Sequence, residues 1–145
     1  MRVEDWNSKL EQVIINLKNK KKFKHGVNDC VTFTIDCIES ITGKKVFDKK
    51  YKNIKEAKKI IKSLKSKDLL DIALKIAKEN NFKTIDIDKA QKGDVLYYVD
   101  TRDLDGTLGV CIGETVMFNW KESITLIKKE DCKIAWRIEW KFIKK

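Results

Sequence analysis

The sequence predicts an α+β fold in which N-terminal helices pack on a C-terminal antiparallel β-sheet. Before residue 80, apolar residues recur at the 3.6-residue period of amphipathic helices; after Asn80 and Asn81 the period changes to two, which is typical of strands. No linker, internal repeat or low-complexity tract interrupts the chain. Helices followed by a run of strands is an α+β plan, and we expect residues 1–145 to form a single domain.

Four helices are expected in the first half. They are predicted at residues 4–19, from an N-cap at Asn28 or Asp29 to a stop at Gly43, within residues 44–67, and over residues 69–78. Because the second helix is apolar around much of its circumference, we expect it to be central and buried. The lysines of the two later helices are interpreted as solvated faces.

The pattern of the second half of the sequence predicts a meander of antiparallel strands. They are expected over residues 95–99, 108–112, 115–118, 123–127 and 134–142. The last strand has Ile134, Trp136 and Ile138 on one face and mostly charged residues on the other, so Trp136 and Trp140 are assigned to the core. Asp94, directly after Gly93, is interpreted as a turn or capping residue without a catalytic task.

Charge and hydropathy narrow the possible partners. The formal net charge is +10, but arginine occurs only at Arg2, Arg102 and Arg137. Because a dedicated reader of DNA or RNA would use arginine forks, the composition argues against nucleic acid as the main partner. No apolar run is long enough to span a membrane, and the polar opening residues do not resemble a secretory signal.

Cysteine and histidine usage argues against metals and disulfides. Four cysteines are far apart in the sequence, with no C-x-x-C pair, and His25 is the single histidine. We therefore expect no metal site and no cofactor. Cys37, Cys111 and Cys132 are interpreted as small buried hydrophobes. Cys30 differs because it begins a helix, where the backbone N–H groups and the helix dipole stabilise a thiolate, so it is the candidate nucleophile.

Three short motifs resemble those of NlpC-type papain-like cysteine peptidases, which cleave the peptide stems of peptidoglycan. They are D-C-V-T-F at 29–33, G-D-V-L at 93–96 and T-L-G-V-C-I-G at 107–113. The resemblance implies a papain-like fold with Cys30 as nucleophile, a general base at Thr107 and a base-orienting residue at Asn119. Threonine cannot accept the thiol proton, so the site is expected to be vestigial. His25 is a weak alternative base.

A second resemblance covers nearly the whole chain. The opening R-V-E-D-W, the D-C-x-x-F element, Tyr51, the L-G-V-C-I-G strand and the final A-W-R are similar to a small uncharacterised family of tailed-phage and prophage genomes, often encoded beside tail genes. This resemblance implies a virion protein of the phage tail, made in the host cytoplasm. Its implied partners are other phage tail proteins and possibly peptidoglycan. Trp120, beside Asn119, is the candidate partner-binding residue.

The sequence therefore predicts a structural or assembly component of the tail-tip or baseplate region, built on a catalytically degenerate NlpC-type fold. Two alternatives stay open. One is an active peptidoglycan cysteine peptidase or amidase with Cys30 as nucleophile. The other is a basic adaptor that binds nucleic acid or an anionic polymer through the lysine-rich helices.

Overall fold

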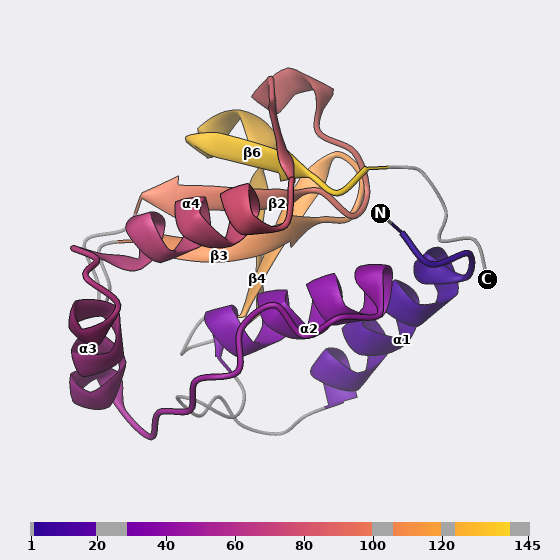
Figure 1. Cartoon of the computed structure of the whole chain (residues 1–145). Coiled ribbons are helices and arrows are strands. Elements are labelled where there is room, and N and C mark those ends of the chain that lie inside the picture. Colours follow the sequence, from indigo (N-terminus) through magenta and orange to yellow (C-terminus); the bar gives the residue numbers. More distant parts are fainter. Residues whose placement is uncertain (1, 20–28, 100–105, 120–123, 140–145) are drawn as a thin grey trace.

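The computed structural model describes residues 2–19, 29–99, 106–119 and 124–139, and within them the chain is an α+β protein (Figure 1). The described elements are α1 (Trp6–Asn19), α2 (Cys30–Thr42), α3 (Ile54–Ser63), α4 (Leu69–Glu79), β1 (Lys83–Ile85), the 3₁₀ turn η1 (Ile87–Lys89), β2 (Val95–Val99), β3 (Gly106–Cys111), β4 (Thr115–Asn119), β5 (Ile124–Lys128), η2 (Lys129–Asp131) and β6 (Ile134–Arg137). The predicted succession of helices and then strands is confirmed.

The strands form one antiparallel sheet in the order β1-β6-β2-β3-β4-β5. Strand β2 is central and pairs with β3 through Val95 and Val110, and with β6 through Val95 and Trp136. Strand β1 was not predicted, because its three residues, Lys83–Ile85, are too few to show a periodic pattern. It lies at one edge of the sheet, and β5 lies at the other.

Helices α1, α2 and α4 cover one face of the sheet and share its main core. This core joins Leu10 of α1 and Ile38 of α2 to Val110 and Trp136 of the sheet, all almost completely buried. The predicted burial of α2 and of Trp136 is confirmed. Apolar burial of this extent is the main stabilising term in a domain of this size.

The opposite face of the sheet is also covered, although the alternate positions of the last strand are mostly charged, as the sequence shows. Ala135 of β6 is fully buried, in a second apolar cluster with Leu96, Cys111, Phe118 and others. Partly buried residues of η1, β1 and β5 pack against this cluster. The consecutive apolar residues of β3 follow from this arrangement, since a strand buried on both faces does not alternate.

Strand β6 ends at Arg137, five residues before its predicted end. The backbone oxygen of Ile138, the residue after the strand, accepts a hydrogen bond from Arg2 Nε at 3.0 Å. At the end of the strand, this oxygen is therefore bonded to a side chain. Residues 140–142 of the predicted strand, with Trp140, lie outside the described residues. In the described part of the chain, no helix has the length and apolar character needed to cross a membrane.

Candidate functional site

The site predicted around Cys30 begins with the N-terminal cap of α2. Asp29 is the N-cap: its Oδ1 accepts a hydrogen bond from the N–H of Thr32 at 2.8 Å, and Thr32 Oγ1 accepts one from the N–H of Asp29 at 2.8 Å. This reciprocal capping box satisfies two backbone donors that would otherwise be unpaired. At the other end, Gly43 closes the helix in a left-handed conformation with φ of 75°. Both predicted ends of the helix are confirmed.

The second carboxylate oxygen of Asp29 holds the segment that follows α2. Tyr51 Oη donates a hydrogen bond of 2.5 Å to Asp29 Oδ2, and both side chains are buried. Because the carboxylate is occupied on both oxygens by cap and tyrosine, its role in the structure is to fix the start of α2. Sequence reasoning had singled out Tyr51 only as part of a resemblance, without assigning it a contact.

Cys30 faces the beginning of β3, as the motif order predicted. Its thiol is partly buried, and it interacts with the side chain of Thr107 and with the backbone N–H groups of Leu108 and Val31. Strand β3 begins at Gly106, two residues earlier than expected, so Thr107 lies within the strand and opposite Tyr98 of β2. The structure therefore places a threonine against the thiol, and none of the described residues near it is a histidine.

The N–H groups at the start of α2 favour the Cys30 thiolate, as expected, but they do not lower the pKa of the thiol overall. Burial raises the pKa of Cys30 to about 11, and the negative charge of Asp29 also raises it. The Thr107 hydroxyl and the N–H groups of Leu108 and Val31 lower the pKa, but they do not outweigh the loss of solvation. At neutral pH the site therefore holds a protonated thiol, the unreactive form.

Asn119 ends β4 and is buried. The antiparallel register that pairs Val110 with Met117 continues toward Leu108 and Asn119, so Asn119 lies at the same end of the sheet as Thr107. His25 and Trp120, the alternative base and the candidate partner-binding residue, lie outside the described residues. The described residues thus bring together Cys30, the predicted nucleophile, and Thr107, at the predicted base position, with Asn119, the predicted orienting residue, on the neighbouring strand.

An apolar cavity of about 40 Å³ adjoins this site between α2, α3, α4 and β3. Its lining includes Val31, Tyr51 and Leu108, the neighbours of Cys30 and its cap. A cavity of this size has room for only a few water molecules, and its walls offer them almost no polar partners. It is a packing defect beside the thiol, too small for a peptide substrate.

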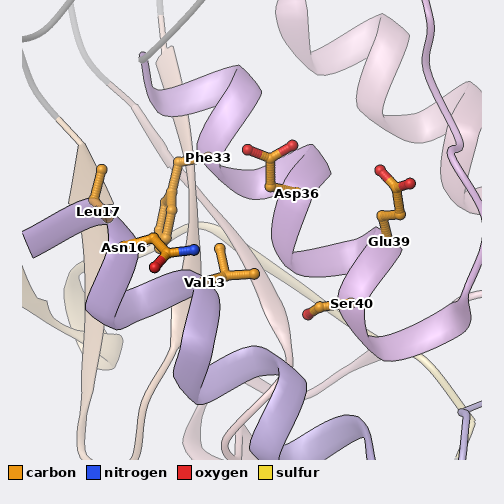
Figure 2. A pocket seen from close by; sticks show the side chains of 7 residues that line it. All are labelled: Val13, Asn16, Leu17, Phe33, Asp36, Glu39 and Ser40. Atoms are coloured by element: carbon orange, nitrogen blue, oxygen red, sulfur yellow. The ribbon is translucent and has the colours of Figure 1, made fainter. Parts of the chain in front are cut away.

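A larger hollow lies between α1 and α2 (Figure 2). It measures about 360 Å³, and its lining combines apolar side chains with two carboxylates: Val13, Asn16, Leu17, Phe33, Asp36, Glu39 and Ser40. The carboxylates come from α2, one turn apart, and make this groove locally acidic in a basic protein. No sequence signal had pointed to it.

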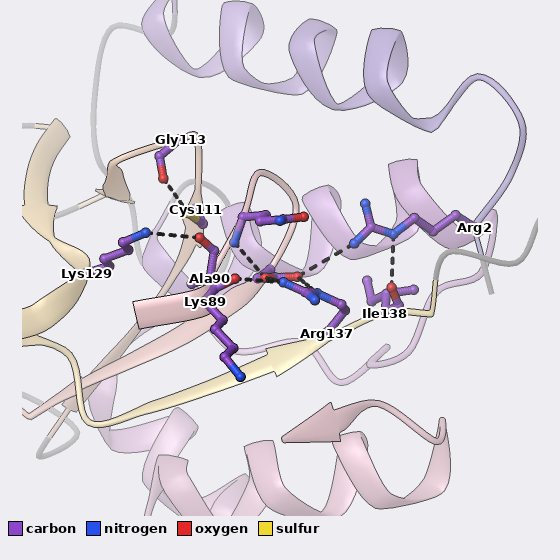
Figure 3. Close-up of polar contacts among 10 residues, drawn as sticks. Arg2, Lys89, Ala90, Cys111, Gly113, Lys129, Arg137 and Ile138 are labelled. Atoms are coloured by element: carbon purple, nitrogen blue, oxygen red, sulfur yellow. Dashed lines mark hydrogen bonds and ion pairs between the residues drawn. The ribbon is translucent and has the colours of Figure 1, made fainter. Parts of the chain in front are cut away.

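A buried ion-pair cluster around Asp94 was also missed by sequence reasoning (Figure 3). Arg137 donates from Nε to Asp94 Oδ1 at 3.1 Å and from Nη2 to Asp94 Oδ2 at 2.9 Å, and Arg2 Nη2 lies 3.6 Å from Oδ1. Asp94 Oδ2 also accepts the N–H of Gln91 at 2.8 Å, so its predicted turn role is confirmed but incomplete. Burial lowers the pKa of Arg2 to about 10, which leaves it cationic at neutral pH.

This cluster joins distant parts of the sequence. The Arg2 guanidinium stacks 4.3 Å from the ring centroid of Trp6, and the Asp94 and Arg2 side chains are completely buried. The opening R-V-E-D-W, the G-D turn and the final A-W-R therefore meet at one point. A signal was present in the sequence: two of only three arginines are used here.

Cys37, Cys111 and Cys132 are buried free thiols, as predicted. Within the described ranges, no three histidine, cysteine or acidic side chains come close enough to hold a metal ion.

The fold and this site define the class of protein: an α+β protein with a partly buried free cysteine at the start of a capped central helix. Residues 1–138 match the family described as "Domain of unknown function (DUF6950)", and the chain belongs to this family. No curated protein matches the sequence.

The raised pKa of Cys30 predicts slow reaction with iodoacetamide at neutral pH. At pH 8, a thiol with a pKa of about 11 has roughly 100-fold less thiolate than one with the ordinary value of 9. We expect the alkylation rate to rise through pH 10, and the Cys30→Ser variant to identify the labelled site by mass spectrometry.

Because folding raises the pKa of Cys30, the contribution of this thiol to the stability of the fold is complete below pH 9 and is lost as the pH rises toward 11. A labelling midpoint below pH 8.5 would contradict the assignment.

Proposed function

We propose that this chain is a structural or assembly component of a phage tail, in the tail-tip or baseplate region, on a papain-like NlpC-type fold without hydrolase activity. The observation that carries the loss of activity is the pairing of a protonated Cys30 thiol with Thr107. Acyl transfer by cysteine needs a thiolate and a base that later protonates the leaving group. At neutral pH a threonine hydroxyl neither accepts the proton of the thiol nor donates a proton to the leaving group.

The tail assignment rests on the resemblance of the sequence motifs to tailed-phage and prophage proteins. The structure supports a structural role for those motifs, since their residues build the scaffold. Asp29 and Tyr51 fix the start of α2, and Arg2, Asp94 and Arg137 join both ends of the described chain to the sheet. These contacts hold the helices and the sheet in fixed positions, and an assembly component needs such a fixed structure to bind its neighbours.

The runner-up is a working peptidoglycan cysteine peptidase or amidase. One observation favours it: the N–H groups of Val31 and Leu108 and the Thr107 side chain all favour the thiolate of Cys30. N–H groups arranged in this way also stabilise the oxyanion of an acyl-transfer intermediate. This candidate would require a base from outside the described residues, such as His25.

The proposal predicts a protein that is present in virions and does not cleave cell-wall peptides. Mass spectrometry of purified, nuclease-treated particles should detect this chain at a fixed ratio to other tail proteins. Purified protein incubated with peptidoglycan stem peptides should release no new termini, because base assistance is worth about 10²–10⁴-fold and Thr107 cannot supply it.

The two candidates are separated by Cys30→Ala and Thr107→His. Hydrolysis by the wild-type chain that disappears in Cys30→Ala would establish the peptidase. Absence from virions would remove the tail assignment even if no hydrolysis occurs. In Thr107→His, an imidazole beside the thiol should lower the alkylation midpoint of Cys30, which checks that the two side chains face one another.

A further inference from the structure

The exposed face of α3 carries a stripe of lysines. Residues that are three, four or seven positions apart lie on one side of a helix. In α3 the lysines with this spacing are Lys55, Lys58, Lys59 and Lys62. All four side chains are exposed, whereas Ala57 and Ile61 on the opposite side are buried. Figure 1 shows α3 at the opposite end of the molecule from α1.

The density of lysines around α3 is high. Residues 44–67 hold eleven of the 29 lysines, where an even distribution would place about five, and only Asp48 and Glu56 oppose them. All eleven are exposed, and none belongs to the ion pairs found among the described residues.

We propose that the α3 lysine face, defined as Lys55, Lys58, Lys59 and Lys62, binds the phosphate backbone of duplex DNA without reading its sequence. Lysine is a point charge that attracts phosphates, whereas base recognition depends mainly on arginine forks and amides. Arg2 and Arg137 are both paired with Asp94, so they are not offered to bases. This inference is independent of the proposed tail function.

A stiff polyanion fits this face better than a flexible acidic chain. The helix holds its charges on a rigid element, one turn of about 5.4 Å apart. A duplex presents fixed phosphates in long rows and loses little conformational freedom on contact, whereas an acidic polypeptide must be ordered first. Asp36 and Glu39 in the groove between α1 and α2 would repel a duplex, so the charge distribution also favours one orientation.

The test compares two variants with the same change in net charge. In the first, the four lysines of the face are replaced by glutamine, which has a helix propensity close to that of lysine. In the control, four exposed lysines on other elements are replaced by glutamine: Lys9, Lys18, Lys83 and Lys89. Binding to a labelled 25-base-pair duplex of arbitrary sequence is measured by fluorescence anisotropy between 50 and 200 mM NaCl, after circular dichroism has shown that both variants are folded.

For the wild-type chain, four phosphate contacts predict a slope of log K against log salt of about −3.6, so affinity should fall roughly 100-fold over this range. The face variant should bind at least tenfold more weakly at 50 mM NaCl and with a much shallower slope, while the control keeps the wild-type slope to within about one. Equal losses in both variants, or wild-type binding by the face variant, would overturn the proposal. So would equal affinity for poly-glutamate of the same charge.

Discussion

Replacing Asp94 by asparagine should destabilise the protein by about 3–5 kcal/mol, the usual cost of removing one partner from a buried ion pair. The substitution preserves the shape of the side chain but leaves the Arg2 and Arg137 guanidinium groups facing a neutral amide. Arg2 is completely buried, so water cannot replace the lost charge. Urea unfolding at pH 7, followed by tryptophan fluorescence, measures the free energy of unfolding directly.

The matched control is Asp86→Asn. Asp86 forms an ion pair with Lys89 at 3.7 Å, but both side chains are mostly exposed, so its loss should cost no more than about 0.5 kcal/mol. Equal effects of the two substitutions would mean that the Asp94 cluster contributes no more than a surface pair. A second check is Arg2→Met, which should destabilise the wild-type chain more than it destabilises the Asp94→Asn chain, because the two residues are coupled.

The sequence predicted the helices and most strands because their signals are local. Asp29 and Gly43 have side-chain and backbone properties that mark helix ends in any protein, and both positions are as expected. The main core was predictable for the same reason, since periodicity identifies the inward face of each helix. Strand β1 and the second core were missed, because a short edge strand and a doubly covered sheet leave no periodic pattern.

The candidate site also has a part that the sequence predicted and a part that it did not. The order of motifs predicted that Cys30 would face Thr107, and the structure places them together. The pKa of the thiol was predicted in the wrong direction, because the helix N-terminus is visible in the sequence but the burial around it is not. The contacts of Asp94 and Tyr51 depend on pairs separated by up to 92 residues, and a single sequence does not encode which partners meet.

Strand β3 supports the site through a close approach to β4, which allows a second strong prediction. A Cβ atom at Gly109 would lie 2.6 Å from the backbone oxygen of Met117 and 2.6 Å from the Phe118 ring. Both distances are too short for non-bonded atoms, and a backbone oxygen within a sheet has little room to move. Gly109 is therefore the residue that lets Phe118 lie against β3 in the second core.

Gly109→Ala should destabilise the protein by at least about 1–3 kcal/mol, the range for forcing extra atoms into a packed core. Comparison with Phe118→Leu and the double variant separates the two contacts. The smaller side chain relieves the contact with the ring but not the contact with the Met117 oxygen, so the double variant should recover only part of the loss, relative to Phe118→Leu alone. Full recovery would assign the whole effect to the ring. A free energy of unfolding in Gly109→Ala equal to that of the wild type would show that β3 and β4 are not so closely packed.

Because Thr107 lies two residues away on the same strand, the alkylation rate of Cys30 in Gly109→Ala reports whether displacement of β3 also exposes the thiol.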